Sequence, residues 1–340
     1  MLKLSSQEPL LTDESVAIGD PNLLNLLLAY SASHRARYLG HAEPANRIAH
    51  LVSDVFPALR VALESPHEDI TDGHLATAIL LVSLKIVSPG TFEVPITWQS
   101  HLKLARDLFL ARSERIAYPG NRIGAFFARW LGYIDTMGAL SCRQAGPPLI
   151  LYHSVLATCC GPEGHDEAGV DCFTGFTPRT GLFLIRLAQL VQQCDNQRFD
   201  EAGNFRHEWH PSADLVMEAQ AVLGDIDDLG ERAHAYPHHH RGIEYQDMMA
   251  IEEAFRYAGL LHLHRRVLGS SPHSYPVKDA LSKLSGALGR MRLGASTEVC
   301  SLFPLFTAGC ESGDPTQRTR LLNRFLVLEK SGMKQVWLSK

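Results

Sequence analysis

The segment from 255 to 269 constrains the fold of this chain more than any other. It reads Phe-Arg-Tyr-Ala-Gly-Leu-Leu-His-Leu-His-Arg-Arg-Val-Leu-Gly, so apolar residues fall on nearly every side of a helical projection. A helix that is apolar almost all round is buried, and it needs other helices packed about it. The segment therefore predicts the inside of a large helical core.

A second apolar segment follows at 302–311 and reads Leu-Phe-Pro-Leu-Phe-Thr-Ala-Gly-Cys-Glu. Proline lacks a backbone N–H, and its ring clashes with the preceding turn of a helix. We therefore expect Pro304 to break or kink any helix that forms here.

Helix signals dominate the rest of the chain. Asp20 precedes Pro21 and is typical of a residue that caps the start of a helix. Thr71 and Asp72 are expected to cap a later helix in the same way. No run of alternating apolar residues is long enough for a sheet, whereas 149–158 fits either a helix or a buried strand. Helices are predicted over 22–38, 45–63 with a possible kink at Pro57, 71–87, 95–115, 121–140, 180–194, the stretch after Pro211-Ser212, 245–268, 277–291, 297–306 and 318–330.

The fold class that follows is an all-α array of about a dozen helices, with a possible hydrophobic pocket between helices. The chain has 340 residues, of which 45% are hydrophobic, and this is enough for a large core. We expect an N-terminal extension over 1–19 and one helical domain over 20–337, with possible sub-lobes at 20–145 and 146–337.

Charge and composition argue against several classes of partner. The net charge is −5, whereas a protein that grips DNA by itself usually carries a basic stripe. We therefore expect no direct contact with nucleic acid. No secretory signal or membrane span is recognisable, so we expect an intracellular chain with reduced cysteines.

Several segments, taken in order, resemble one known family. Trp98, His101, Leu102 and Ala105 fit a W-x-x-H-L-x-x-A pattern. The other matching segments are 26–35, 74–81, Asp171 with Gly175-Phe176, 253–258, 261–266, 302–311 and 318–333. Together they resemble the fungal-specific transcription factor domain, the regulatory part of fungal zinc-cluster activators. The resemblance covers roughly residues 20 to 337 and implies a helical regulatory domain.

One feature of that family is missing from this sequence. Zinc-cluster activators hold two zinc ions with six closely spaced cysteines, whereas the first cysteine here is Cys142. Either the sequence is a fragment or the gene lacks the cluster. We expect a stand-alone protein that does not recognise DNA as its relatives do.

Two functions from different classes remain open. In the first, the resemblance implies a regulatory domain that binds a hydrophobic small molecule, pairs with itself or with a co-regulator, and acts in the nucleus. In the second, the scaffold serves fungal secondary metabolism in the cytoplasm. It would then be a cofactor-independent cyclase or isomerase, pericyclase-like, acting on a polyene or terpenoid.

The candidate site residues are aromatic, histidine and arginine side chains within apolar helices. Such groups supply hydrogen-bond donors inside a shaped apolar pocket. A structural role is the commoner one for a helical histidine, and we expect His262 nearer the core than His264. No metal and no cofactor is expected. The candidates are His262, Arg265, Tyr257 and His101 for catalysis, and Trp98, Tyr133, His153 and Phe255 for ligand binding.

Overall fold

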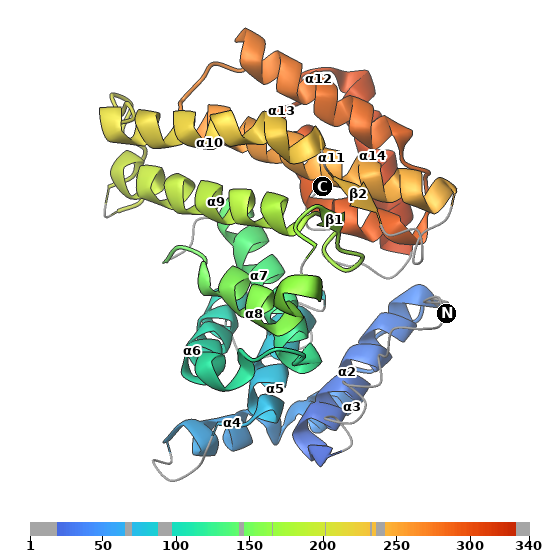
Figure 1. Cartoon of the computed structure of the whole chain (residues 1–340). Coiled ribbons are helices and arrows are strands. Elements are labelled where there is room, and N and C mark those ends of the chain that lie inside the picture. The colour runs from blue at the N-terminus through green and yellow to red at the C-terminus, as the bar shows by residue number, and fades with distance from the viewer. Residues whose placement is uncertain are drawn as a thin grey trace. The chain divides into compact units, whose positions relative to one another are not determined.

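The computed structural model describes residues 19–64, 70–87, 97–142, 146–164, 166–200, 202–231, 233–235 and 242–330. Nearly all of the regular structure in these residues is α-helical, which confirms the predicted all-α class (Figure 1). Two short strands, β1 (Gly169–Val170) and β2 (His234–Ala235), pair in parallel over two residues each.

The helices follow one another along the chain. They are α2 (Pro21–Tyr38), α3 (Ala45–Val52), α4 (Val55–Glu64), α5 (Asp72–Val87), α6 (Trp98–Ile116), α7 (Arg122–Ser141), α8 (Leu151–Gly164), α9 (Pro178–Arg198), α10 (Ala213–Glu231), α11 (Ile243–His262), α12 (Tyr275–Arg290), α13 (Leu302–Glu311) and α14 (Pro315–Lys330). A π-helical turn (Leu263–Val267) follows α11, and a 3₁₀ turn (Ser296–Ser301) precedes α13.

The chain folds into two compact units that alternate along the sequence. The N-terminal unit holds the described residues up to 131, together with 155–162 and those from 325 onward, and the C-terminal unit holds 132–154 and 163–324. The boundaries therefore fall inside α7, α8 and α14. The predicted single domain over 20–337 with its sub-lobes stays a prediction.

In the N-terminal unit, α5 packs against α2 and α6, and α3 packs against α2 (Figure 1). Asp20 caps α2 as its sequence predicts, because its carboxylate accepts hydrogen bonds from the backbone N–H groups of Asn22 and Leu23 at 2.9 and 3.2 Å. The core of this unit includes Leu26, Leu75 and Phe109, none of which has exposed surface.

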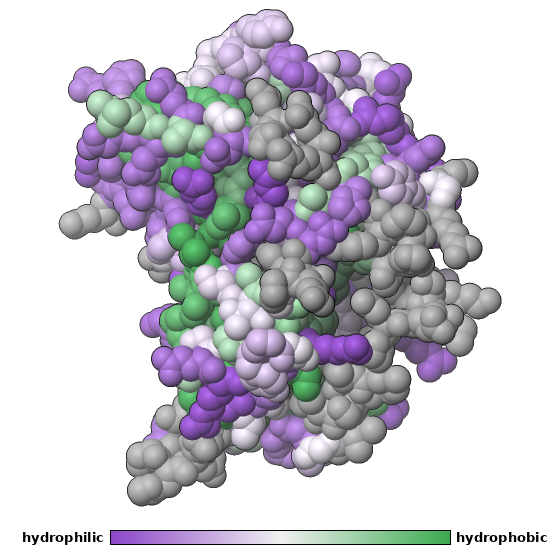
Figure 2. Space-filling model, in the orientation of Figure 1, coloured by the Kyte–Doolittle hydropathy of each residue, from purple (hydrophilic) through white to green (hydrophobic). Residues whose placement is uncertain are grey.

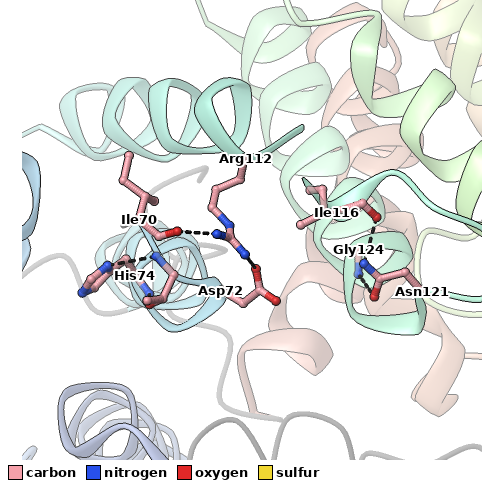
Figure 3. Close-up of polar contacts among 8 residues, drawn as sticks. Ile70, Asp72, His74, Arg112, Ile116, Asn121 and Gly124 are labelled. Carbon is pink, nitrogen blue, oxygen red and sulfur yellow. Dashed lines mark hydrogen bonds and ion pairs between the residues drawn. The ribbon is translucent and has the colours of Figure 1, made fainter. Parts of the chain in front are cut away.

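Arg112 of α6 fastens the start of α5. Its guanidinium donates to the carbonyl of Ile70 and pairs with the carboxylate of Asp72 (Figure 3). Thr71 caps the helix as predicted, because its Oγ1 accepts from the N–H of His74 at 3.2 Å. The beginning of α5 is thus held by a side chain 40 residues away in sequence.

Asn121 sets the turn between α6 and α7. Its amide nitrogen donates to the carbonyl of Ile116 at 2.8 Å, and its amide oxygen accepts from the N–H of Gly124 at 3.1 Å (Figure 3). The same side chain therefore satisfies a C-terminal carbonyl of α6 and an N-terminal N–H of α7.

Several helix boundaries differ from the prediction, and two of these differences lie in the N-terminal unit. The segment 45–63 forms α3 and α4 and not one kinked helix, and the break lies at Ser53-Asp54 instead of Pro57. Pro57 stands in the first turn of α4, where a helix does not use the backbone N–H. The helix expected from Pro95 begins at Trp98, because Thr97 is extended and caps it by accepting from the N–H of Ser100 at 3.3 Å.

The expectation for Pro304 was wrong. Residues 302–311 form one uninterrupted helix, α13, and Pro304 is its third residue. The first N–H groups of a helix have no partner within the helix, so a proline there removes no hydrogen bond. The chain enters α13 through the 3₁₀ turn, which places the proline at that tolerant position.

In the C-terminal unit, α11 packs against α9, α12 and α13, and α9 packs against α10 (Figure 1). The ambiguous segment 149–158 belongs to helix α8. The predicted buried helix is α11, and its apolar side chains are enclosed as its pattern requires. Ala254, Phe255, Ala258 and Leu261 have no exposed surface.

A buried carboxylate ties α11 to α9. Glu252 has no exposed surface, accepts from the hydroxyl of Thr180 at 2.7 Å, and accepts from Arg256 Nε at 2.9 Å. Burial raises the pKa of Glu252, while Arg256 and Thr180 act against that rise. Gly230 of α10 leaves room for the guanidinium, since a Cβ there would lie 2.3 Å from Arg256 Nη1.

Candidate functional site

Five rings form a continuous row inside the C-terminal unit. Tyr133 stacks on Phe176 with ring centroids 6.2 Å apart, and Phe176 meets Phe255 edge-on at 4.8 Å. Phe255 then stacks on Phe303 at 6.0 Å, and Phe303 stacks on His262 at 5.3 Å. Ring contacts at these separations are individually favourable. We call these five side chains the aromatic row.

The row joins four parts of the fold. Tyr133 lies on α7, Phe303 on α13, and both Phe255 and His262 on α11. Phe176 lies in the turn before α9. The three phenylalanines are at most 8% exposed, whereas Tyr133 and His262, at the two ends, retain intermediate exposure. The row is therefore apolar in its middle and has a polar group at each end.

Gly175 allows the turn that carries Phe176 to approach the row. A Cβ at this position would lie 2.8 Å from Ile251 Cγ2 and 3.0 Å from Cys300 Cβ. Its φ of +84° is also a conformation that other residues rarely adopt. Glycine is thus required here for both space and backbone conformation.

Two parallel polar contacts join the end of α11 to α13. His262 Nε2 lies 3.1 Å from Thr307 Oγ1, and Arg265 Nε donates to Glu311 at 2.9 Å. Thr307 and Glu311 are one helical turn apart on α13, and His262 and Arg265 are three residues apart in the chain. Side chains selected from the sequence for catalysis therefore bind a neighbouring helix.

The ring of His262 is uncharged in the folded protein. Burial lowers its pKa to about 3, and the positive charge of Arg266 acts in the same direction. Burial also lowers the pKa of His264, and it raises the pKa of the Tyr133 hydroxyl above its ordinary value. Both polar ends of the aromatic row are therefore neutral at physiological pH.

The expected order of burial of the two histidines was wrong for the whole residues. His264 is only 9% exposed, whereas His262 retains intermediate exposure. Burial nevertheless lowers the pKa of His262 to about 3, and its ring stacks on Phe303 and lies 3.1 Å from the Thr307 hydroxyl.

The π-helical turn after α11 holds the ends of two other helices. Arg266 donates to the carbonyl of Leu140 on α7, and its Nη2 lies 2.7 Å from the carboxylate of Asp195 on α9. Arg198 of α9 donates back to the carbonyl of Arg266. A widened turn of this kind often occurs at functional sites, and here it directs an arginine between two helices.

Three of the eight predicted site residues meet in the aromatic row, namely Tyr133, Phe255 and His262. Arg265 lies beside them in its contact with Glu311. Tyr257 is not in the row, because its ring lies 5.7 Å from the cations of Arg256 and Lys283.

The remaining candidates lie on other helices. His153 is half-buried on α8 of the C-terminal unit. Trp98 and His101 both lie on α6 of the N-terminal unit, where the ring of His101 is 5.6 Å from that of Phe56. The set proposed for catalysis therefore does not come together within one unit.

Sequence reasoning missed Phe176, Phe303 and Thr307. Gly175-Phe176 was noticed only as a point of resemblance, and 302–311 as an apolar run and a point of resemblance. No local pattern marks Thr307 as the partner of His262. That contact spans 45 residues. Such partners become visible only once helix packing is known.

Among the described residues, no three His, Cys, Asp or Glu side chains gather closely enough to hold a metal ion. Within the same ranges, no helix is long and apolar enough to cross a membrane. Figure 2 shows mixed hydrophilic and hydrophobic surface on one face, including over α10, where Met217 is 61% exposed.

A family model described as the fungal specific transcription factor domain matches residues 5–340.

The chain belongs to this family.

Membership in the fungal specific transcription factor domain family supports a regulatory role in transcription. The aromatic row and the π-helical turn both lie within the matched residues, so they are parts of this chain's regulatory domain. No curated protein and no solved structure matched the chain.

Proposed function

We propose that this chain is a regulatory domain of the nucleus that binds a hydrophobic small molecule and does not contact DNA by itself. The observation that carries the proposal is the family match over residues 5–340, which agrees with the all-α fold. The net charge of −5 supports the absence of direct DNA contact, because phosphate binding relies on clustered basic residues.

The aromatic row is the place proposed for the ligand. Phe176, Phe255 and Phe303 supply an apolar surface, and ligand sites in proteins combine such a surface with a few polar groups. Tyr133 and His262 supply those groups at the two ends, and both are neutral. A neutral apolar ligand with one hydrogen-bonding group fits this chemistry better than a charged one.

Binding beside this row would act through the arrangement of helices. The row joins α7, α11, α13 and the turn before α9, so a ligand that prefers one arrangement of these elements shifts the population towards it. We further propose that the domain pairs with a second copy or with a co-regulator protein. Sedimentation equilibrium of the purified chain tests self-pairing, and a monomer at all concentrations would leave only the co-regulator.

The enzyme alternative gains no support. His101 lies in the N-terminal unit, and Tyr257 faces Arg256 and Lys283 instead of His262. His262 and Arg265 are engaged with α13. The contacts seen for these residues and the family match therefore lend the enzyme alternative no support.

Titration with the neutral apolar dye Nile red tests ligand binding. We expect a saturable rise in fluorescence with the wild-type chain and weaker binding with Phe176→Leu. Phe205→Leu is the matched control, because Phe205 is 47% exposed and contacts Phe199 and His207 outside the row. Circular dichroism establishes that each variant is folded. Absence of saturable binding, or equal loss in both variants, would count against the proposed site.

A gel-shift titration with random-sequence duplex DNA tests the second part. The purified chain is expected to leave the duplex unshifted at physiological salt. A shift that weakens steeply with added salt would show phosphate contacts and contradict the proposal.

A further inference from the structure

Two cysteines lie just before rings of the aromatic row, one in the turn that carries Phe176 and one in the 3₁₀ turn that leads into α13. Cys172 is exposed in the turn before α9, and Cys300 lies in the 3₁₀ turn before α13. They are separated by 128 residues in sequence, from position 172 to position 300. Both are thiols in the structure.

The turn at Cys172 is closed by several hydrogen bonds. The N–H of Gly175 donates to the carbonyl of Asp171 at 2.9 Å, and the Asp171 carboxylate accepts from the N–H groups of Phe173 and Thr174 at 3.0 and 2.9 Å. These bonds keep Cys172 and Gly175, three residues apart in the chain, within one closed turn.

Cys300 packs against the same turn. Its Sγ lies 3.7 Å from the carbonyl oxygen of Phe173, and a Cβ built on Gly175 would lie 3.0 Å from Cys300 Cβ. Cys300 Cβ therefore lies at the Gly175 end of the turn that holds Cys172. A disulfide requires the two Cβ atoms to come to about 3.5–4.5 Å of each other, which a small movement of this exposed turn would supply. We propose that Cys172 and Cys300 form a reversible disulfide when a hydroperoxide oxidises this domain.

In the overall reaction, two thiols and one hydroperoxide give one disulfide, one water and one alcohol. When the oxidant is hydrogen peroxide, a second water forms in place of the alcohol. The Cys172 thiolate attacks the peroxide, so an S–O bond forms, the O–O bond breaks and the departing oxygen takes up a proton. The sulfur of Cys300 then displaces the hydroxyl from Cys172 as water, and the S–S bond forms. Cys172 is exposed whereas Cys300 is half-buried, so the peroxide reaches Cys172 first. Burial also raises the pKa of Cys300 to about 12, with Asp171 and Cys172 adding to the rise.

The bond would brace the aromatic row from outside. Phe176 follows Cys172 in the turn, and Phe303 follows Cys300 at the start of α13, while Phe255 lies between these two rings. Joining the turn to α13 would fix the spacing of the row. The disulfide itself does not depend on the proposed function, whereas an effect on ligand binding rests on it.

Peptide mapping under non-reducing conditions tests the bond. The purified chain is treated with hydrogen peroxide, blocked with iodoacetamide, and cut with trypsin and Asp-N. The peptide 171–179 contains only Cys172, and 293–313 contains Cys300 and Cys310. We expect a cross-linked pair of these peptides that dithiothreitol separates and that disappears in Cys300→Ser.

Cys310→Ser is the matched control, because Cys310 is exposed and stands in the same peptide. The cross-link should persist in this variant. Its loss there, or conversion of Cys172 to sulfinic acid without any cross-link, would overturn the proposal. Nile red titration of the oxidised protein then tests whether the disulfide affects ligand binding. If the cross-link forms but dye binding is unchanged, the disulfide is supported and its effect on ligand binding is ruled out.

Discussion

Arg266 Nη2 lies 2.7 Å from Asp195 Oδ2, and this pair joins the π-helical turn to α9. The side chains are only 22% and 7% exposed, so water screens the pair weakly. The same guanidinium also donates to the carbonyl of Leu140 at the end of α7. One side chain therefore fixes the ends of two helices that flank the aromatic row.

Removing this arginine should destabilise the C-terminal unit strongly. Arg266→Met leaves the Asp195 carboxylate without its cation, and breaking a buried pair in this way costs about 3–5 kcal/mol. Urea unfolding measures the loss. The double variant with Asp195→Leu should recover much of it, since no uncompensated charge remains.

Arg290→Met supplies the control for that experiment. Arg290 pairs with Glu253, but its side chain is 55% exposed, and surface pairs contribute about 0–1 kcal/mol. Equal losses for the Arg266 and Arg290 variants would show that the π-helical turn has no special part in holding the helices.

The contact between His262 and Thr307 should also be measurable. Thr307→Val keeps the shape of the side chain but removes the hydrogen bond, and we expect a loss of about 1–2 kcal/mol in the free energy of unfolding. Thr319→Val on the exposed side of α14 should change it by less than about 0.5 kcal/mol. Indistinguishable values would mean that the His262 ring does not depend on this hydroxyl.

The pKa of His262 predicts a specific dependence of stability on pH. Its folded pKa is about 3, below the ordinary value of 6.5, so between these values the unfolded chain binds more protons than the folded one. The contribution of His262 is complete above pH 6.5 and is lost as pH falls towards 3. The slope is up to about 1.4 kcal/mol per pH unit.

His262→Gln isolates that contribution, since glutamine retains a hydrogen-bonding group but does not titrate. The difference in unfolding free energy between wild type and variant should shrink by this slope as the pH is lowered from 6.5. A difference that is independent of pH would contradict a neutral, buried His262 ring.

Gly175 should tolerate alanine less well than a glycine of similar backbone conformation. Gly269 has a φ of +65° and would place its Cβ in open space, so Gly269→Ala costs only the backbone strain, about 1–2 kcal/mol. Gly175→Ala adds contacts with Ile251 and Cys300 and should cost about 1–3 kcal/mol more. Thermal unfolding of the two variants gives the comparison, and equal costs would rule out close packing at Gly175.

The buried helix was predictable because its own residues encode it. The apolar pattern of 255–262 requires burial on several sides, and α11 has that environment. Caps such as Asp20 and Thr71 were equally readable, since they act within three residues. Local physics therefore gave the fold class and most of the helix ends.

The candidate site was predictable only in part. Tyr133, Phe255 and His262 were chosen because such side chains suit an apolar pocket, and they do share one row. The polar partner of His262 was not predictable, because its contact with Thr307 spans 45 residues. The prediction that Pro304 breaks or kinks its helix was wrong for a related reason. Proline is tolerated there only because α13 begins two residues earlier, and the sequence does not show where the helix begins.

The central claim is that this chain regulates transcription, and a reporter assay tests it most directly. The chain is fused to a DNA-binding module whose target site precedes a reporter gene, and expression is compared with that of the module alone at equal protein level and equal occupancy of the site. We predict that the fusion changes reporter transcription, and that Arg266→Met removes the change. Equal transcription from the wild-type fusion and the module alone would contradict the account.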